Sequence, residues 1–193
     1  FTSSLAVFGA PFPDRIDDEF FLTPRTSYGT QKAIGELLLA DYARKGFLDA
    51  IGIRLPTVCI RTGAPNQAAA GVFSNILREP LIGKQAILPV ADTVRHWHVS
   101  PRRAVGFLLH AAAIDTARLR HRCVLTMPGL SATVGEQIEA LRRVARARAV
   151  ALIRPAPDPL LARPPPGWAQ DFAAARALAP PFAPAPPSAA PPP

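Results

Sequence analysis

The pattern of apolar and polar positions predicts alternating helices and strands. Between about Ser27 and Lys45, apolar residues recur three and four positions apart, as on one side of a helix, and Gly46 follows as a helix end. These apolar positions are Ile34, Leu37, Leu38 and Tyr42. Further helices are predicted at 69–78, ending before Pro80, at 101–116 and at 131–147. Residues 1–8 are interpreted as the end of a strand that runs into a loop. Short apolar or β-branched runs predict strands at 49–58, 86–90, 94–99, 122–126 and 150–154. The alternation predicts an α/β fold with a mainly parallel sheet.

The composition changes after Arg154. Fourteen of the 23 prolines lie in residues 155–193, and the stretch from Pro180 onward is almost only Pro, Ala, Phe and Ser. Such a segment has little apolar surface to bury, so we expect a largely disordered Pro/Ala-rich tail. Two readings of it stay open: an interaction segment for proline-binding domains, or an end without a function of its own.

Charge and hydropathy exclude some classes of protein. No run of eighteen apolar residues occurs and no basic, then apolar leader is visible, so we expect no membrane span and a cytoplasmic location. The net charge is +8, and residues 102–148 hold nine arginines against three acids. Those arginines are scattered through helical repeats, which favours a solvated surface over a nucleic-acid patch.

The cysteines and histidines do not form a metal motif. Cys59 and Cys123 lie in apolar, strand-like runs without metal or redox spacing, so we expect buried free thiols. His96 and His98 alternate on a predicted strand and therefore face the same side. A third ligand is not evident, so we interpret them as core or loop histidines and expect no metal.

Tyr28 and Lys32 are the first candidates for catalytic residues. Within the helix predicted from Ser27, they are four residues apart and lie on one face. An ammonium beside a phenol favours the phenolate, and a phenolate can take a proton from an alcohol. A hydroxyl that holds the substrate oxygen would complete such a site, and Thr2, Ser3 and Ser4 lie a short distance upstream.

Four pieces of sequence, in order, resemble the extended short-chain dehydrogenases/reductases, the NAD-dependent epimerase/dehydratase family. Phe1–Gly9 resembles the family's strand that ends in S-S-x-x-V-Y-G, and Tyr28-x-x-x-Lys32 resembles its catalytic pair. Arg54–Val58, followed by Gly63, resembles R-x-x-N-V-x-G-P, and Arg95–Ser100 resembles R-x-x-H-V-x-D with Ser100 in the place of Asp. Within the family, the chain is most similar to a branch that oxidises a four-carbon sugar acid at C2.

The resemblance implies a fold and a division of the chain. We expect the C-terminal half of a Rossmann-type, doubly wound parallel sheet in residues 1–62, which would carry the catalytic residues. A small α/β substrate-binding region, interleaved with the last sheet strands, is expected in residues 63–154. Residues 155–193 are the expected tail. Long helices such as 27–45 pair into dimers in this family, so we also expect a homodimer.

The resemblance also implies roles for individual residues. Ser4 would hold the substrate oxygen, with Thr2 and Ser3 as alternatives for that hydroxyl. Tyr28 would take the proton, and Lys32 would favour the phenolate and bind the nicotinamide ribose. The remaining expected cofactor contacts are Thr2, Ser3, Pro56, Thr57 and Val58.

A sugar-acid substrate needs a partner for its carboxylate. Arginine suits this purpose because its guanidinium binds a carboxylate through two parallel hydrogen bonds. The candidates are Arg61, Arg78 and Arg95, with Asn66 as a further polar contact. For each of them a surface role is the alternative.

The glycine-rich cofactor motif of the family does not occur in these 193 residues. We therefore expect an N-terminally truncated dehydrogenase that uses NAD rather than NADP and that binds it weakly as this chain alone. Two alternatives stay open. One is a sugar-nucleotide epimerase or dehydratase of the same family, and the other is a non-catalytic protein that binds partners through its basic face or Pro-rich tail.

Overall fold

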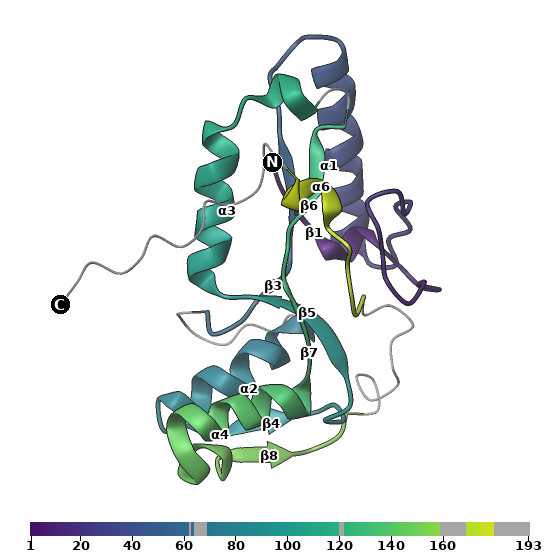
Figure 1. The fold of residues 1–193 in the computed structure, drawn as a ribbon. Coiled ribbons are helices and arrows are strands. Elements are labelled where there is room, and N and C mark those ends of the chain that lie inside the picture. Colours follow the sequence, from purple (N-terminus) through teal and green to yellow (C-terminus); the bar gives the residue numbers. More distant parts are fainter. Residues whose placement is uncertain (62, 64–68, 120–121, 159–168, 180–193) are drawn as a thin grey trace, which may run out of the picture.

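The computed structural model describes residues 1–61, 63, 69–119, 122–158 and 169–179, and two groups of elements are evident in it (Figure 1). The first group is a parallel sheet between two helices. Its strands are β1 (Thr2–Ser4), β2 (Gly52–Leu55) and β6 (Val124–Thr126), in the order β1-β2-β6. Helix α1 (Ser27–Arg44) lies on one side of this sheet and α3 (Pro101–Ala113) on the other.

The second group lies beyond the carboxyl ends of these strands. It contains the sheet β3-β5-β7 and the parallel pair β4-β8, packed with helices α2 and α4 (Figure 1). The strands are β3 (Thr57–Val58), β4 (Ala86–Leu88), β5 (Arg95–Val99), β7 (Leu130–Thr133) and β8 (Ile153–Pro155), and the helices are α2 (Val72–Leu81) and α4 (Val134–Val150). Short 3₁₀ turns occur at Leu5–Val7, Ala69–Gly71 and Thr116–Leu119.

Capping residues set where the long helices begin. The Thr26 side chain accepts a hydrogen bond from the Gly29 amide at 3.0 Å, which satisfies one of the free N–H groups at the start of α1. Ser100 caps α3, which has Pro101 in its first turn. Thr133 and Glu136 form a capping box at the start of α4.

The expected α/β fold with largely parallel pairing is confirmed, whereas several element boundaries differ from those expected. Residues 131–133 were expected in a helix but lie in β7, which pairs antiparallel with β5. Thr133 is the N-cap of α4, so the helix begins only after it. The second helix was expected to end before Pro80, yet α2 continues to Leu81. Pro80 is buried on the same helix as Phe73 and Ile76, so packing outweighs the lost backbone hydrogen bond.

The apolar stripe predicted on α1 lies at the surface. Its residues are about half exposed or more, whereas the buried positions of the helix are Gly29, Ala33 and Glu36. The helix therefore packs on the sheet through small residues and one carboxylate. The spacing predicted the helix correctly without showing which side is buried.

The C-terminal segment Ala169–Ala179 departs from the expected disordered tail. Phe172 is 1% exposed and contacts Phe8 and Trp97, with ring centroids 5.7 and 5.6 Å away. Ile16 pairs with Phe172 as a parallel bridge, and the short helix α6 (Ala175–Leu178) buries Ala177 against α3 and the sheet. These contacts correct the expectation for 169–179, while 159–168 and 180–193 of the expected tail lie outside the described residues.

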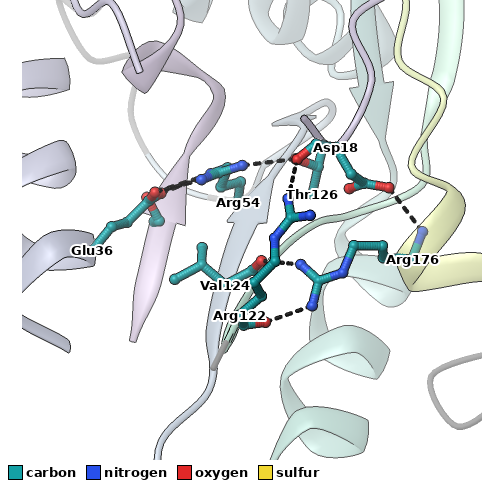
Figure 2. A network of polar contacts seen from close by, with 8 residues as sticks. Asp18, Glu36, Arg54, Arg122, Val124, Thr126 and Arg176 are labelled. Atoms are coloured by element: carbon teal, nitrogen blue, oxygen red, sulfur yellow. Dashed lines mark hydrogen bonds and ion pairs between the residues drawn. The ribbon is translucent and has the colours of Figure 1, made fainter. Parts of the chain in front are cut away.

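Arg176 fixes this segment to the edge of the first sheet (Figure 2). Its guanidinium donates to the backbone carbonyls of Arg122 at 2.6 Å and Val124 at 3.1 Å, and its amide donates to Asp18 at 2.8 Å. The Arg122 guanidinium in turn donates to the Asp18 carbonyl and pairs with Glu19. Residues far apart in sequence are thus joined by hydrogen bonds at this edge of the sheet.

Candidate functional site

Tyr28 and Lys32 lie together on the first turns of α1, beside β1. The Lys32 ammonium donates to the Thr2 backbone carbonyl at 2.8 Å and lies 5.6 Å from the centroid of the Tyr28 ring. It also lies 5.2 Å from the centroid of the Phe1 ring, so two aromatic faces and a carbonyl surround its charge. The predicted pair is therefore brought together, and it is bound to the strand that carries Ser4.

Ser4 ends β1 next to the start of α1. Its Oγ accepts a hydrogen bond from the Ala6 amide at 3.2 Å, which begins the 3₁₀ turn. A Cβ at Gly29 would overlap the Ala6 carbonyl oxygen, so the helix approaches this turn more closely than any other residue would allow. Tyr28 is adjacent to Gly29 and is 53% exposed, so this residue lies at the surface.

A buried ion pair next to these residues was not predicted. Glu36, one turn after Lys32 and 2% exposed, accepts from Arg54 through Nε at 2.9 Å and through Nη2 at 2.7 Å. Ser3 also donates its hydroxyl to Glu36. Arg54 donates to Thr126 at 3.3 Å (Figure 2). The signal available in the sequence was the glutamate four residues after Lys32 on the same helix face.

The expected cofactor-contact residues after β2 lie on and beside β3. Thr57 is paired with His98 in the parallel ladder between β3 and β5, and its hydroxyl lies 2.7 Å from His96 Nε2. Pro56 is buried, whereas Thr57 and Val58 are partly exposed. These residues continue from the carboxyl end of β2, the strand that neighbours β1.

The two histidines of β5 are core residues, as expected. Burial, with the neighbouring His98, lowers the pKa of His96 to about 3, and burial lowers the pKa of His98 to about 4. His96 stacks on Phe73 with centroids 4.6 Å apart. Among the residues that the structure describes, no group of three potential ligands could hold a metal ion.

The cysteines are free and buried, which confirms the expectation. The Cys59 thiol lies 3.3 Å from His98 Nδ1. Burial raises the pKa of this thiol to about 12. Burial also raises the pKa of Cys123. Thiols in such surroundings stay protonated and are poor nucleophiles.

The three arginines proposed for the substrate carboxylate have different surroundings. Arg78 is 8% exposed, pairs with Glu79 at 2.5 Å and donates to the Arg61 carbonyl and to Asn75. Arg95 pairs with Glu136 at 3.3 Å and donates to the Ser131 carbonyl. Arg61 is partly exposed, and its backbone is held by the Ser74 and Arg78 side chains. Asn66 lies outside the described residues.

The residues present fit the nicotinamide end of a dinucleotide. Ser4 lies at the carboxyl end of β1, and the first turns of α1, which carry Tyr28 and Lys32, lie beside this strand and the turn after it. Doubly wound sheets bind such cofactors at the carboxyl ends of their strands. The exposed Tyr28 ring leaves this end open to a ligand. The glycine-rich turn that would hold the pyrophosphate does not occur in the sequence.

Comparison with known proteins decides the family. The model of the NAD dependent epimerase/dehydratase family matches residues 1–108, more than half of the chain. The chain belongs to this family. Two relatives, both named D-erythronate dehydrogenase, are 51% identical over 145 residues in Cupriavidus necator and 46% identical over 144 residues in Haemophilus influenzae. The chain spans about half the length of these relatives, 45% and 46%.

Solved structures of other proteins have a similar fold. The crystal structure of the nucleoside-diphosphate-sugar epimerase from Agrobacterium tumefaciens is 66% identical, with a TM-score of 0.88 over 92% of this chain and 52% of that chain. L-threonine 3-dehydrogenase from Trypanosoma brucei is 21% identical, with a TM-score of 0.79 over 92% of this chain and 54% of its own length, and this likeness concerns the fold alone. Among the described residues, no helix is both long and apolar enough to span a bilayer.

Proposed function

We propose that the protein containing this chain is an NAD-dependent dehydrogenase that oxidises the C2 hydroxyl of a small sugar acid such as D-erythronate. The observation that supports the proposal is Ser4 at the end of β1, with the Tyr28 and Lys32 pair of α1 beside that strand. The identity to two proteins named D-erythronate dehydrogenase supports the choice of substrate.

Each of the three residues has one task in this reaction. The Ser4 Oγ accepts from the Ala6 amide, so its own proton remains to donate to the substrate oxygen. Tyr28, as the phenolate, takes the hydroxyl proton, and the Lys32 ammonium stabilises the phenolate charge. The cofactor, when bound, supplies the acceptor for the C2 hydride. An alcohol thus becomes a ketone, with its proton on Tyr28.

Cofactor and substrate contacts follow from the same arrangement. We assign the nicotinamide end to Thr2, Tyr28 and Lys32 on one side and to Pro56–Val58 on the other. Ser3, also expected there from the sequence, is left out because it is 2% exposed and its hydroxyl donates to Glu36. For the substrate carboxylate we favour Arg61, because Arg78 and Arg95 already have carboxylate partners within the protein. Asn66 remains a candidate from the sequence.

We further propose that this chain alone is impaired, because the sequence offers no pyrophosphate-binding turn. Calorimetric titration of the 193-residue chain with NAD tests this directly. We expect a dissociation constant well above the micromolar range, and a low-micromolar value would overturn the proposal of impairment.

Activity is tested in a chimaera in which this chain replaces the matching segment of the C. necator enzyme. We expect steady NADH formation from D-erythronate. Tyr28→Phe should lower kcat by about 10²–10⁴-fold, the usual contribution of a general base. Tyr42→Phe, on the same helix, is the matched control. Full turnover in the Tyr28 variant would rule out the mechanism, and an active, folded chimaera without D-erythronate oxidation would rule out the substrate.

A second candidate is a sugar-nucleotide epimerase. It is favoured by the 66% identity to the A. tumefaciens protein described as a nucleoside-diphosphate-sugar epimerase. The same chimaera distinguishes the two functions, because an epimerase interconverts sugar nucleotides without accumulating NADH. Epimer formation at constant NADH would support this candidate over the dehydrogenase.

We also propose that the protein forms a homodimer through α1. Its exposed face carries Ile34, Leu37, Leu38 and Tyr42, and an apolar stripe of this kind on a surface helix suits a helix from a second copy. Sedimentation velocity gives the oligomeric state, and Leu37→Glu should shift a dimer to a monomer. A monomer at high concentration would contradict the proposal.

A further inference from the structure

Two neighbouring hydrogen bonds join α1 to β1. Lys32 donates to the Thr2 carbonyl at 2.8 Å, and Ser3, the next residue of the strand, donates to Glu36, one turn further along the helix. Ser4 is the next residue of the same strand. Any sliding of β1 along α1 would therefore move Ser4 relative to Tyr28 and would break both bonds.

Both oxygens of the Glu36 carboxylate accept hydrogen bonds from other side chains. One oxygen accepts from Ser3 and from Arg54 Nε, and the other accepts from Arg54 Nη2 at 2.7 Å. Arg54 belongs to β2, which pairs with β1 so that Ser3 lies opposite Arg54. Glu36 thus binds one residue on each of the two strands whose carboxyl ends form the site.

A second ion pair of the same kind lacks this connection. Arg78 and Glu79 are also buried and also form charged hydrogen bonds, at 2.5 Å. However, both residues belong to α2, so their pairing joins no helix to a strand of the site. A buried glutamate can thus have one of two roles. Glu79 neutralises an arginine of its own helix, whereas Glu36 also joins a helix to two strands.

We propose that Glu36 is a positioning residue for the Ser4, Tyr28 and Lys32 site. It acts through Ser3 and Arg54 and sets the register of β1 and β2 against the helix that carries the general base. This inference rests on the proposed function, because it assigns Glu36 to the same site.

The test on the 193-residue chain uses Lys32 as a reporter. The chain has three lysines, so limited acylation followed by mass spectrometry of peptides gives the labelling of Lys32 relative to Lys45 and Lys84. Ser3→Ala removes the hydroxyl but keeps the charge pair, and Glu36→Gln removes the charge. Both should raise relative Lys32 labelling about fivefold, the factor that one typical net hydrogen bond represents.

Glu79→Gln is the matched control, since it removes a buried, arginine-paired carboxylate elsewhere. It should lower the urea midpoint as Glu36→Gln does, yet leave Lys32 labelling unchanged. Unchanged Lys32 labelling in Ser3→Ala overturns the proposal, and so does an equal rise in Glu79→Gln. Should Glu36→Gln fail to fold, Ser3→Ala decides the matter.

Turnover in the chimaera separates this inference from the proposed function. Ser3→Ala should lower kcat about tenfold with little change in KM, because misplaced groups weaken the transition state more than the ground state. An unchanged kcat together with raised labelling would overturn the positioning role while leaving the proposed function intact. If Tyr28→Phe keeps full turnover, the proposed function fails, and the labelling still reports whether Glu36 aligns the strand.

Discussion

At the scale of single residues, burial sets the ionisation of the two β5 histidines. His96 lies between Phe73 and the Thr57 hydroxyl, and His98 lies beside the Cys59 thiol. Neither position solvates an imidazolium, so the neutral form prevails and the pKa values fall to about 3 and about 4. The two imidazole rings therefore pack as aromatic residues of the core and also form hydrogen bonds, His96 with the Thr57 hydroxyl and His98 with the Cys59 thiol.

The lowered pKa values make the free energy of unfolding depend on pH. In the unfolded chain these histidines take up protons near pH 6.5, whereas in the folded protein they stay neutral down to about pH 4. Their contribution to the free energy of unfolding is therefore full above pH 6.5 and decreases as the pH falls toward 4. Between pH 7 and pH 5, we expect a loss of about 2 kcal/mol for each histidine. Urea unfolding at both pH values measures it.

His96→Asn is the informative variant for this prediction. It removes one of the two titrations and should reduce the pH-dependent loss by about half. Carboxylates such as Asp41 and Glu136, whose pKa values are lowered by hydrogen bonds, contribute equally in both proteins. An identical slope in the two proteins would contradict the assignment.

The sequence predicted part of the candidate site. Tyr28 and Lys32 were found because helical spacing alone places them on one face, and the structure places them together. Glu36 and Arg54 were not assigned to the site, because their pairing depends on where the helix lies against the sheet. Arg78 was considered for substrate binding, yet its guanidinium is buried against Glu79, a contact that spacing does not reveal.

At the scale of elements, α1 shows two faces with different tasks. The face on the sheet is built from Gly29 and Ala33, with the Glu36 carboxylate, and it permits a close approach to the turn after β1. The opposite face is apolar and exposed. Periodicity predicted the helix and its length but did not show which face packs on the sheet, because close packing here needs small residues rather than large ones.

Two glycine substitutions test this close approach. Gly→Ala in a helix normally stabilises a protein by about 0.5–1 kcal/mol. Gly106→Ala in α3 should follow this rule, since nothing lies within 4 Å of the added methyl group. Gly29→Ala should instead destabilise by about 1–3 kcal/mol, because the methyl group would overlap the Ala6 carbonyl. Thermal unfolding compares them, and a stabilised Gly29→Ala would contradict the packing.

At the scale of the whole molecule, the C-terminal segment completes the core. Phe172 fills the space between Phe8 and Trp97, and Ala177 is fully buried against the first sheet. The proline-rich composition around this segment concealed it, because Ala169–Ala179 itself contains no proline and brings one large apolar side chain to a site prepared by distant residues. Composition averaged over a window cannot show such a contact.

Substitution of Phe172 measures what the segment contributes. Phe172→Ala should cost about 3–5 kcal/mol, as for other fully buried phenylalanines. Leu178→Ala, in the same segment but 52% exposed, should change stability by less than about 0.5 kcal/mol. Urea unfolding followed by tryptophan fluorescence compares the two. Equal, small effects would show that the segment is not part of the folded core.

The Arg176 contact has a consequence for solubility. β6 is the last strand of its sheet among the described residues, and a free strand edge can pair with another chain and begin aggregation. Arg176 occupies the Arg122 and Val124 carbonyls along that edge and places a positive charge there. A segment that resembles a dispensable tail in composition therefore covers this edge, which should lower the tendency of β6 to pair with another chain.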